Sequence, residues 1–324
     1  MKTILLTGCD GFIGSHVAEE LLNNGYKIIG IDNNSKYKFP YQEHHKHLNF
    51  EFYKYDIIKN PELTDVFHEE KFDAVIHAAA IIGGIEMFHK RPFDIIRDNA
   101  IMDAKIIDLA SYYEKKFIGL SSSMVYENAN IWPTPESCID NIRRPHSSYG
   151  QSKLIQEDMI KAAHEQENLQ YTIIRPFNAI GVRENDFLEG KSSHVLPDLI
   201  LKCLRDDYMI DILGDGTQVR HYTDVRDISR GIRLALECPE AINTDFNIST
   251  DKSTTVLMLA KKVWYKIHPD KPFKYISKPA YKHDVQKRIP CTKKAKDVLG
   301  FESKIPLDTT IDLVIDYIKN AIQN

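Results

Sequence analysis

Two side chains on one predicted helix are spaced for acid–base chemistry. Tyr149 and Lys153 open a helical segment expected over Tyr149 to Glu167, and four positions separate them. One helical turn therefore places both side chains on the same face. An ammonium beside a phenol favours the phenolate and lowers its pKa from about 10 toward neutral pH. A Tyr/Lys pair is common on helix surfaces, so the prediction that Tyr149 is a general base depends on the segments around it.

A set of three glycines supplies the second chemical signature. Gly8, Gly11 and Gly14 follow a predicted strand over Thr3 to Thr7 and open a predicted helix over Phe12 to Asn24. At such a junction the first glycine permits a tight turn, the second lets the backbone approach a pyrophosphate, and the third allows close helix–strand packing. The N-terminus of the helix also attracts the anion. The segment therefore predicts a dinucleotide site.

Acidic residues near this turn select the dinucleotide. Asp32 ends the second predicted strand, 18 positions beyond Gly14, where a carboxylate binds the adenosine ribose hydroxyls and repels a 2′-phosphate. We expect Asp10 to add negative charge within the turn itself. Asp56 follows the third strand, where it either reaches the adenine amino group or caps a turn. These carboxylates favour NAD over NADP.

The elements that position these residues alternate between strand and helix in the first half of the chain. This pattern predicts an α/β fold, a Rossmann-type doubly wound parallel sheet over residues 1–176. We expect a smaller α/β substrate lobe over residues 177–324, some segments of which return to the first domain. The expected strands are Thr3 to Thr7, Lys27 to Asp32, Asn49 to Tyr55, Ala74 to Ala79, Phe117 to Ser121 and Tyr171 to Arg175. The expected helices are Phe12 to Asn24, Phe93 to Glu114, Tyr149 to Glu167, Asp224 to Leu236, Thr254 to Ile267 and Leu307 to Ile322.

Composition excludes several classes of function. The 324 residues include 42 Lys and Arg against 46 Asp and Glu, a net charge of −4, which disfavours nucleic acid as a partner. Nowhere do about 18 apolar residues run together, so no transmembrane helix is expected. Gly8 and Asp10 interrupt the N-terminal apolar run before a signal peptide can form. We therefore expect a cytoplasmic protein that does not associate with membranes.

Cysteine and histidine form no recognisable metal motif. The five cysteines are scattered singly, with no CxxC pair, which is typical of reduced thiols. The run from Glu43 to His47 contains three histidines, but adjacent side chains point apart and no partner motif accompanies the run. We interpret it as a solvated loop and expect no metal.

Six motifs together resemble a known family. They are TGCDGFIG at 7–14, HAAA at 77–80, SSSMVY at 121–126, YGQSK at 149–153, RPFNAIG at 175–181 and GDGTQVRHYTDVRDI at 214–228. Their order and spacing resemble the extended short-chain dehydrogenase/reductase family, in particular its NAD-dependent nucleotide-sugar epimerases and dehydratases, over essentially the whole chain.

The resemblance implies roles for individual residues. Ser122 aligns with the catalytic Ser or Thr that hydrogen-bonds the reacting hydroxyl. Lys153 would bind the nicotinamide ribose and act with Tyr149, and Asn99 would hold the catalytic helix or its water. The catalytic set expected from this alignment is therefore Ser122, Tyr149 and Lys153.

The resemblance also outlines the binding surfaces for cofactor and substrate. Asn178 is expected near a sugar diphosphate, which Arg220 and Arg288 would neutralise. Besides the residues already named, we expect the cofactor to contact Phe12, Ile13, Asn33, Ile57, Ala78, Ala79, Ala80 and Pro176. The substrate is expected to contact Gly83, Gly84, Ser123, Met124, His194 and Val195.

The residues that follow Ser122 discriminate among the reactions of this family. The 4,6-dehydratases carry an Asp-Glu pair at positions 123 and 124, and the decarboxylating members keep a Glu. Ser123 and Met124 cannot do this acid–base work. Both activities are therefore disfavoured.

Two further segments tilt the expected nucleotide slightly toward GDP over UDP. Ala79 to Ile85 and Ser192 to Pro197 are similar to GDP-fucose synthase, and the first also to GDP-mannose 3,5-epimerase. Those enzymes use a Cys where this chain has Met124, so epimerisation at C3 or C5 is not expected. His194 is then expected to hydrogen-bond a sugar hydroxyl or to cap its helix.

With dehydration, decarboxylation and epimerisation at C3 or C5 disfavoured, the remaining reaction is hydride transfer at C4 of a hexose. We predict an NAD-dependent nucleotide-sugar 4-epimerase that works through a transient 4-keto sugar. The alternatives are a nucleotide-sugar 4-dehydrogenase or 4-ketoreductase with net turnover of NAD(H), and a catalytically silent NAD-sensing scaffold. Retention of Tyr149 and Lys153 disfavours the scaffold. The helices expected over Phe93 to Glu114 and Tyr149 to Glu167 are the pair that similar enzymes place between subunits, which predicts a homodimer.

Overall fold

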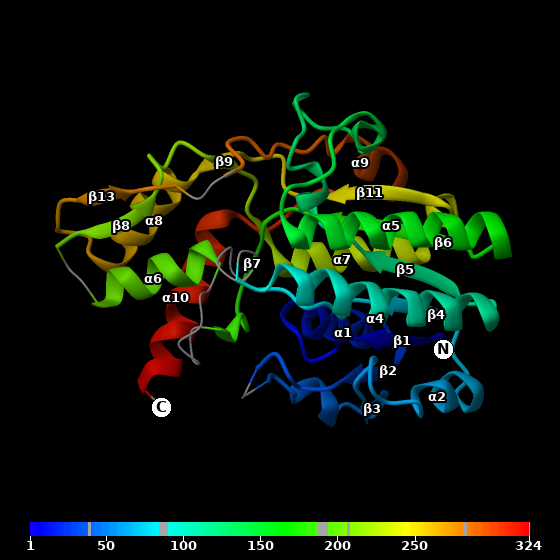
Figure 1. Ribbon diagram of the computed structural model, residues 1–324. Coiled ribbons are helices and arrows are strands. Elements are labelled where there is room, and N and C mark those ends of the chain that lie inside the picture. Colours follow the sequence, from blue (N-terminus) through cyan, green and yellow to red (C-terminus); the bar gives the residue numbers. More distant parts are fainter. Residues whose placement is uncertain (38–39, 84–89, 187–193, 206–207, 281–283, 324) are drawn as a thin grey trace.

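A seven-stranded parallel sheet forms the centre of the protein. The computed structural model describes residues 1–37, 40–83, 90–186, 194–205, 208–280 and 284–323 (Figure 1). The strands are β1 (Thr3–Thr7), β2 (Lys27–Asp32), β3 (Phe50–Lys54), β4 (Ala74–His77), β5 (Lys116–Leu120), β6 (Tyr171–Pro176) and β11 (Thr244–Ile248). Their order is β11-β6-β5-β4-β1-β2-β3, and every neighbouring pair is parallel. The predicted Rossmann-type sheet is thereby confirmed.

The strand order reverses at β1, which lies between β2 and β4. In doubly wound folds, ligands bind at such a switch point, outside the carboxyl ends of the strands. The glycine-rich turn follows β1 directly, and Ala78 to Ala80 follow β4. The topology thus brings the first two sequence motifs to one crevice.

Helices cover both faces of the sheet. One face carries α1 (Phe12–Asn23), α7 (Val225–Glu237) and α9 (Lys293–Leu299), and the other carries α2 (Leu63–Glu69), α4 (Pro92–Tyr112) and α5 (Ser148–Glu167). Successive side chains of a strand point to opposite faces. Accordingly, Ile4 and Leu6 of β1 join the core under α1, whereas Leu5 joins the core under α4.

A second lobe has its own apolar core around the fully buried Trp264. It contains α6 (Val195–Arg205), α8 (Val256–Ile267) and α10 (Leu307–Gln323) with the strand pair β8 (Ile210–Leu213) and β13 (Tyr275–Lys278). Figure 1 shows this lobe beside the carboxyl ends of the sheet strands. Two short pairs, β7 (Ala179–Ile180) with β10 (Thr223–Asp224) and β9 (Val219–Arg220) with β12 (Thr254–Thr255), connect it to the sheet. The remaining short elements are the 3₁₀ helices η1 (Glu43–Lys46), η2 (Ser123–Tyr126), η3 (Glu136–Asn141) and η5 (Pro239–Ala241).

The chain crosses back to the first domain after the second lobe begins. β11 extends the sheet beyond β6, α7 packs beside α1, and α9 packs on β11. The strand β11 has only five residues in the Gly- and Pro-punctuated half of the sequence, so its pattern did not mark it as a sheet strand. Among the described helices, none combines the length and apolar character that crossing a membrane requires.

The histidine run is not a solvated loop, contrary to our interpretation. Residues 43–46 form η1, and the ring of His44 is buried. It packs edge-on against Phe50 with ring centroids 4.7 Å apart, while His45 stacks on the same ring at 4.8 Å. Aromatic partners from β3 thus draw both imidazoles inward, a contact that spacing along the chain could not reveal.

Candidate active site

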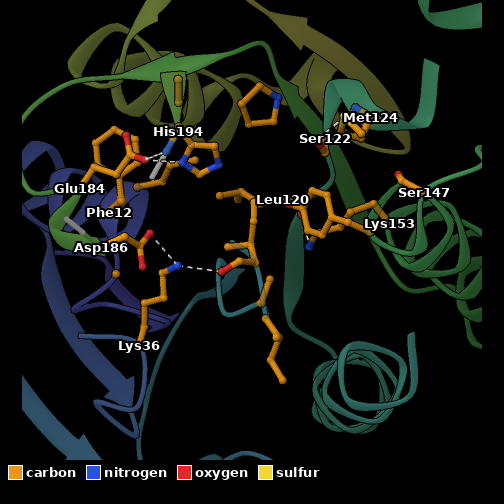
Figure 2. A pocket seen from close by; sticks show the side chains of 18 of the residues that line it. Phe12, Lys36, Leu120, Ser122, Met124, Ser147, Lys153, Glu184, Asp186 and His194 are labelled. Atoms are coloured by element: carbon orange, nitrogen blue, oxygen red, sulfur yellow. Dashed lines mark hydrogen bonds and ion pairs between the residues drawn. The ribbon is translucent and has the colours of Figure 1, made fainter. Parts of the chain in front are cut away.

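A cavity of about 1430 Å³ opens at the carboxyl ends of β1, β4 and β5, with the second lobe on its opposite side (Figure 2). It brings together most of the residues singled out from the sequence. Those that line it are Gly8, Gly11, Phe12, Ile13, Gly14, Asp32, Asn33, Asp56, Ile57, Ala78, Ala79, Ala80, Ser122, Ser123, Met124, Tyr149, Lys153, Pro176, Asn178, His194, Val195, Arg220 and Arg288.

The glycine turn packs so tightly that a side chain would not fit at Gly8 or Gly14. Gly8 has a φ of 70°, in the left-handed region, and a Cβ there would lie 2.7 Å from the backbone nitrogen of Ala79. A Cβ on Gly14 would lie 1.9 Å from the carbonyl oxygen of Gly8. Gly11 forms the N-cap of α1, whose first turn faces the cavity. The turn therefore presents backbone N–H groups and a helix N-terminus, which suits a pyrophosphate.

Asp32 lies at the end of β2 and lines the cavity beside this turn. Its Oδ1 accepts a hydrogen bond from the backbone N–H of Asn34 at 2.8 Å, and its Oδ2 accepts one from the backbone N–H of Asp10 at 3.1 Å. Burial raises the pKa of Asp32. The carboxylate is thus held in place where ribose hydroxyls are expected.

Asp10 does not face the cavity, which corrects our expectation for its side chain. Its carboxylate is 1% exposed, and its Oδ2 accepts hydrogen bonds from the amides of Asn34 at 2.7 Å and Gln42 at 2.8 Å. These partners turn the carboxylate away from the dinucleotide pocket toward η1. Of the two carboxylates expected to oppose a 2′-phosphate, Asp32 lines the cavity and Asp10 does not.

Ser122 and Tyr149 come together at the end of β5. Ser122 is the N-cap of η2, and its Oγ accepts a hydrogen bond from the backbone N–H of Met124 at 3.1 Å. Tyr149 is buried in the first turn of α5, and burial raises its pKa, whereas a hydrogen bond with Ser122 lowers it. The further lowering of this pKa by Lys153 stays a prediction.

Lys153 is fixed by a buried polar chain. Its Nζ donates to the carbonyl oxygen of Leu120 at 2.8 Å and to Oε1 of Gln156 at 3.2 Å. Gln156 in turn donates to Asp103 at 2.6 Å, and the same carboxylate oxygen lies 3.0 Å from Nε2 of His77. Burial lowers the pKa of Lys153, while the negative charge of Asp103 raises it. The ammonium is thereby aimed at the base of the cavity (Figure 2).

Two arginines meet at the far end of the cavity. Arg288 donates from Nη1 to Oδ1 of Asn178 at 3.4 Å, and Arg220 lies 3.5 Å from Asp284. Burial lowers the pKa of both guanidinium groups, and the positive charge of Arg220 lowers that of Arg288 further. Two like charges in one partly buried place form a site for an anion.

A second group of charged residues lies across the cavity from Ser122, and it includes His194, which the sequence had singled out. Both the backbone nitrogen and Nδ1 of His194 contact Oε1 of the buried Glu184, whose charge raises the pKa of the imidazole. Nearby, Lys36 donates to Asp186 at 3.0 Å. Figure 2 shows these pairs facing Ser122 and Lys153. No local motif marked Lys36, Glu184 or Asp186, whereas His194 belongs to the segment Ser192 to Pro197 that the sequence had singled out.

Besides Asp10, two expected site residues among the described ones, Asn99 and Gly83, do not line the cavity. Asn99 is buried, accepts from the backbone N–H of Ile81 at 2.7 Å and donates to Oγ of Ser152 at 3.2 Å. It therefore ties the segment after β4 to α5 and acts on the site through that helix. Gly83 is buried outside the cavity lining, and Gly84 lies outside the described residues.

Comparison with known proteins agrees with this geometry. The sequence model of the NAD dependent epimerase/dehydratase family matches residues 4–249. The chain belongs to this family. The turn from Gly8 to Gly14, which leaves no room for a Cβ at Gly8 or Gly14, and the fixed Asp32 fit NAD, the cofactor of the family.

Similar solved structures and sequences extend over almost the whole chain. UDP-glucose 4-epimerase from Thermotoga maritima, solved with UDP-glucose, is 32% identical, with a TM-score of 0.85 and 99% of each chain covered. UDP-glucuronic acid 4-epimerase from Bacillus cereus, solved with UDP-glucuronic acid and NAD, is 27% identical, with a TM-score of 0.86 and 98% of this chain and 99% of that chain covered. UDP-glucuronic acid decarboxylase 1 from Danio rerio is 25% identical over 100% of this chain and 74% of its own length. The chain is therefore an enzyme of a family with epimerase and decarboxylase members.

Proposed function

We propose that this enzyme is an NAD-dependent UDP-sugar 4-epimerase. The observation that carries the proposal is the cluster of Ser122, Tyr149 and Lys153 beside the dinucleotide turn, followed by Ser123 and Met124, which carry no acid. That cluster can move a proton at a secondary alcohol but offers no carboxyl group at positions 123 and 124 for elimination or decarboxylation.

Proton transfer at C4 follows from the placement of the hydroxyl groups of Tyr149 and Ser122. Tyr149 takes the proton of the C4 hydroxyl, while Ser122 hydrogen-bonds the same oxygen and supports the phenolate. Held by the glycine turn and Asp32, bound NAD would supply the hydride acceptor and donor for C4, so that oxidation to a 4-keto sugar and its reduction on the other face leave the cofactor unchanged overall. Lys153, held by Leu120 and Gln156, places a positive charge at the base of the cavity, where it favours the phenolate.

The nucleotide we propose is UDP, which replaces the slight preference for GDP drawn from the sequence. The 4-epimerases that resemble this chain are described as UDP-sugar enzymes, and none of the three relatives named above is a GDP-sugar enzyme. Arg220 and Arg288 would neutralise the diphosphate, which both nucleotides share. The arginines therefore support a nucleotide diphosphate, and the relatives support uridine.

The decarboxylase relative calls for a separate test, because its similarity spans this whole chain. Decarboxylating members of the family keep a Glu where this chain has Ser123 and Met124, so we expect UDP-glucuronic acid to be inverted at C4 or left unchanged, without release of carbon dioxide.

The experiment is incubation of the purified enzyme with a panel of UDP- and GDP-hexoses and UDP-glucuronic acid in deuterium oxide, followed by NMR. We expect inversion at C4 of a UDP-sugar, no deuterium at C3 or C5, and no stoichiometric NADH. Tyr149→Phe is the control. Its turnover should fall by about 100-fold or more, while it still binds NAD. Stoichiometric NADH would favour the 4-dehydrogenase, and a pentose product would favour the decarboxylase.

A further inference from the structure

Four metal-ligating side chains converge beneath the glycine turn, outside the cavity. They are Cys9 and Asp10 from the turn and His44 and His45 from η1. One ligand atom from each lies within 4.8 Å of the ligand atoms of all the others. The side chains of Asp10 and His44 are 1% and 0% exposed. Neither the NAD site nor the proposed reaction uses this cluster.

Three distances that share Oδ1 of Asp10 lie within about 0.6 Å of the edges of a tetrahedral zinc site. Oδ1 of Asp10 lies 3.0 Å from Nε2 of His44, 2.7 Å from Nε2 of His45 and 3.6 Å from Sγ of Cys9. Zinc bonds of about 2.0–2.3 Å give tetrahedral edges of about 3.3 Å between nitrogen and oxygen and about 3.5 Å between sulfur and oxygen. Small shifts would therefore place one ion among the four atoms.

Surrounding residues hold the four side chains in this arrangement. Asn34 and Gln42 both donate to Oδ2 of Asp10, so Oδ1 is left facing the cysteine and the histidines. The ring of His45 also packs on Phe52, with centroids 4.3 Å apart, in addition to its contact with Phe50. Such partners orient metal ligands and are a regular part of metal sites.

We propose that Cys9, Asp10, His44 and His45 bind a single zinc-class divalent ion. A thiolate and two imidazoles select a borderline-soft ion such as Zn²⁺ over Mg²⁺ or Ca²⁺, which take oxygen ligands. One thiolate, one carboxylate and two neutral imidazoles balance the double charge of the ion, which a buried site requires. The Nε2–H groups of His44 and His45 both donate to Oδ1 of Asp10, so ion binding displaces both hydrogens; in His44 the hydrogen can move to Nδ1, which has no hydrogen-bond partner among the described residues.

The ion would join η1 to the turn that carries the dinucleotide. The backbone N–H of Asp10 donates to Oδ2 of Asp32 at 3.1 Å, so the metal site and the ribose-binding carboxylate share one backbone segment. The site is structural rather than catalytic, since it does not line the cavity. This replaces the expectation from sequence that the chain binds no metal. Adjacent His44 and His45 do point together, because η1 is a tight 3₁₀ turn and β3 packs both rings inward.

Cobalt titration of the full-length, chelator-treated protein tests the proposal. Co²⁺ should bind at one equivalent with the visible bands of a tetrahedral site and a thiolate-to-cobalt band in the near ultraviolet, and Zn²⁺ should displace it. Cys9→Ser should abolish the thiolate band, and His45→Ala should weaken binding by at least about tenfold. Two control variants lie outside the cluster: His47→Ala, at an exposed histidine, and Cys238→Ser. Both should bind Co²⁺ as the parent does.

Two results would overturn the proposal. One is the lack of any stoichiometric binding of Co²⁺ or Zn²⁺ at micromolar concentration. The other is a thiolate band that survives Cys9→Ser. Circular dichroism reports whether each variant folds; His45, whose side chain is 20% exposed, provides the informative variant if Cys9→Ser does not fold.

Discussion

The hydroxyl groups of Ser122 and Tyr149 are hydrogen-bonded, and this contact lowers the pKa of a tyrosine that burial otherwise raises. A general base must lose its proton before it can accept one from the substrate. In the proposed mechanism Ser122 therefore has two roles, one through the substrate hydroxyl and one through the ionisation of Tyr149.

Ser122→Ala should shift the pH dependence of turnover. Activity rises with pH as Tyr149 ionises, and loss of a contact that lowers the pKa of Tyr149 moves this rise to higher pH. We also expect turnover at neutral pH to fall by about 10- to 100-fold. Rates measured from pH 6 to 10 check this, with Ser122→Thr as the conservative control. An unshifted profile in Ser122→Ala would contradict the assigned role.

Asp32→Ala should narrow the preference for NAD over NADP. Asp32 lines the cavity, whereas the carboxylate of Asp10 points away from it, so we expect Asp32 rather than Asp10 to oppose the 2′-phosphate. Titration of the parent and the variant with both cofactors measures the preference. If the parent binds NADP as tightly as NAD, or if the ratio of the two affinities is the same in Asp32→Ala, Asp32 does not select the cofactor.

Arg288→Gln should raise KM for the nucleotide sugar by about 10- to 100-fold, with a smaller effect on kcat. A charge-assisted contact to the diphosphate is lost, while the groups near Ser122 remain. Arg143→Gln is the matched control, because Arg143 is exposed and lies outside the cavity lining. A fall in kcat at constant KM would instead place Arg288 in the chemical step.

The protein should be a homodimer that pairs through α4 and α5. These helices pack against each other on one face of the sheet, and α4 exposes Phe93 and Tyr112, which are 69% and 75% exposed. Light scattering at micromolar concentration should give twice the 37.3 kDa mass of the chain. A mass near 37.3 kDa would contradict the prediction.

The sequence was most informative where chemistry depends on local spacing. The spacing of the glycines in a strand-to-helix turn fixes the shape of that turn, and the spacing of Tyr149 and Lys153 places both on one helix face. The turn at Gly8 and the start of α5 were therefore predictable. Spacing does not give the direction in which a side chain points. Asp10 was therefore placed in the dinucleotide site, whereas Asn34 and Gln42 turn it toward η1.

Contacts between distant segments were the part that the sequence could not supply. Glu184 accepts a hydrogen bond from the backbone N–H of His194, ten positions further along the chain, and Phe50 of β3 packs against His44 of η1. The seventh strand, β11, was missed because five residues with mixed polarity carry little periodicity. Each of these features depends on tertiary packing rather than on local pattern.

The most direct test of the 4-epimerase assignment is the fate of the hydrogen at C4. UDP-hexose carrying deuterium at C4 is incubated with the enzyme in ordinary water, and the product is examined by NMR and mass spectrometry. Because that hydrogen leaves and returns within one active site, we predict an inverted product that keeps its deuterium at C4. Loss of the deuterium to water, or its accumulation in free reduced cofactor, would contradict the assignment.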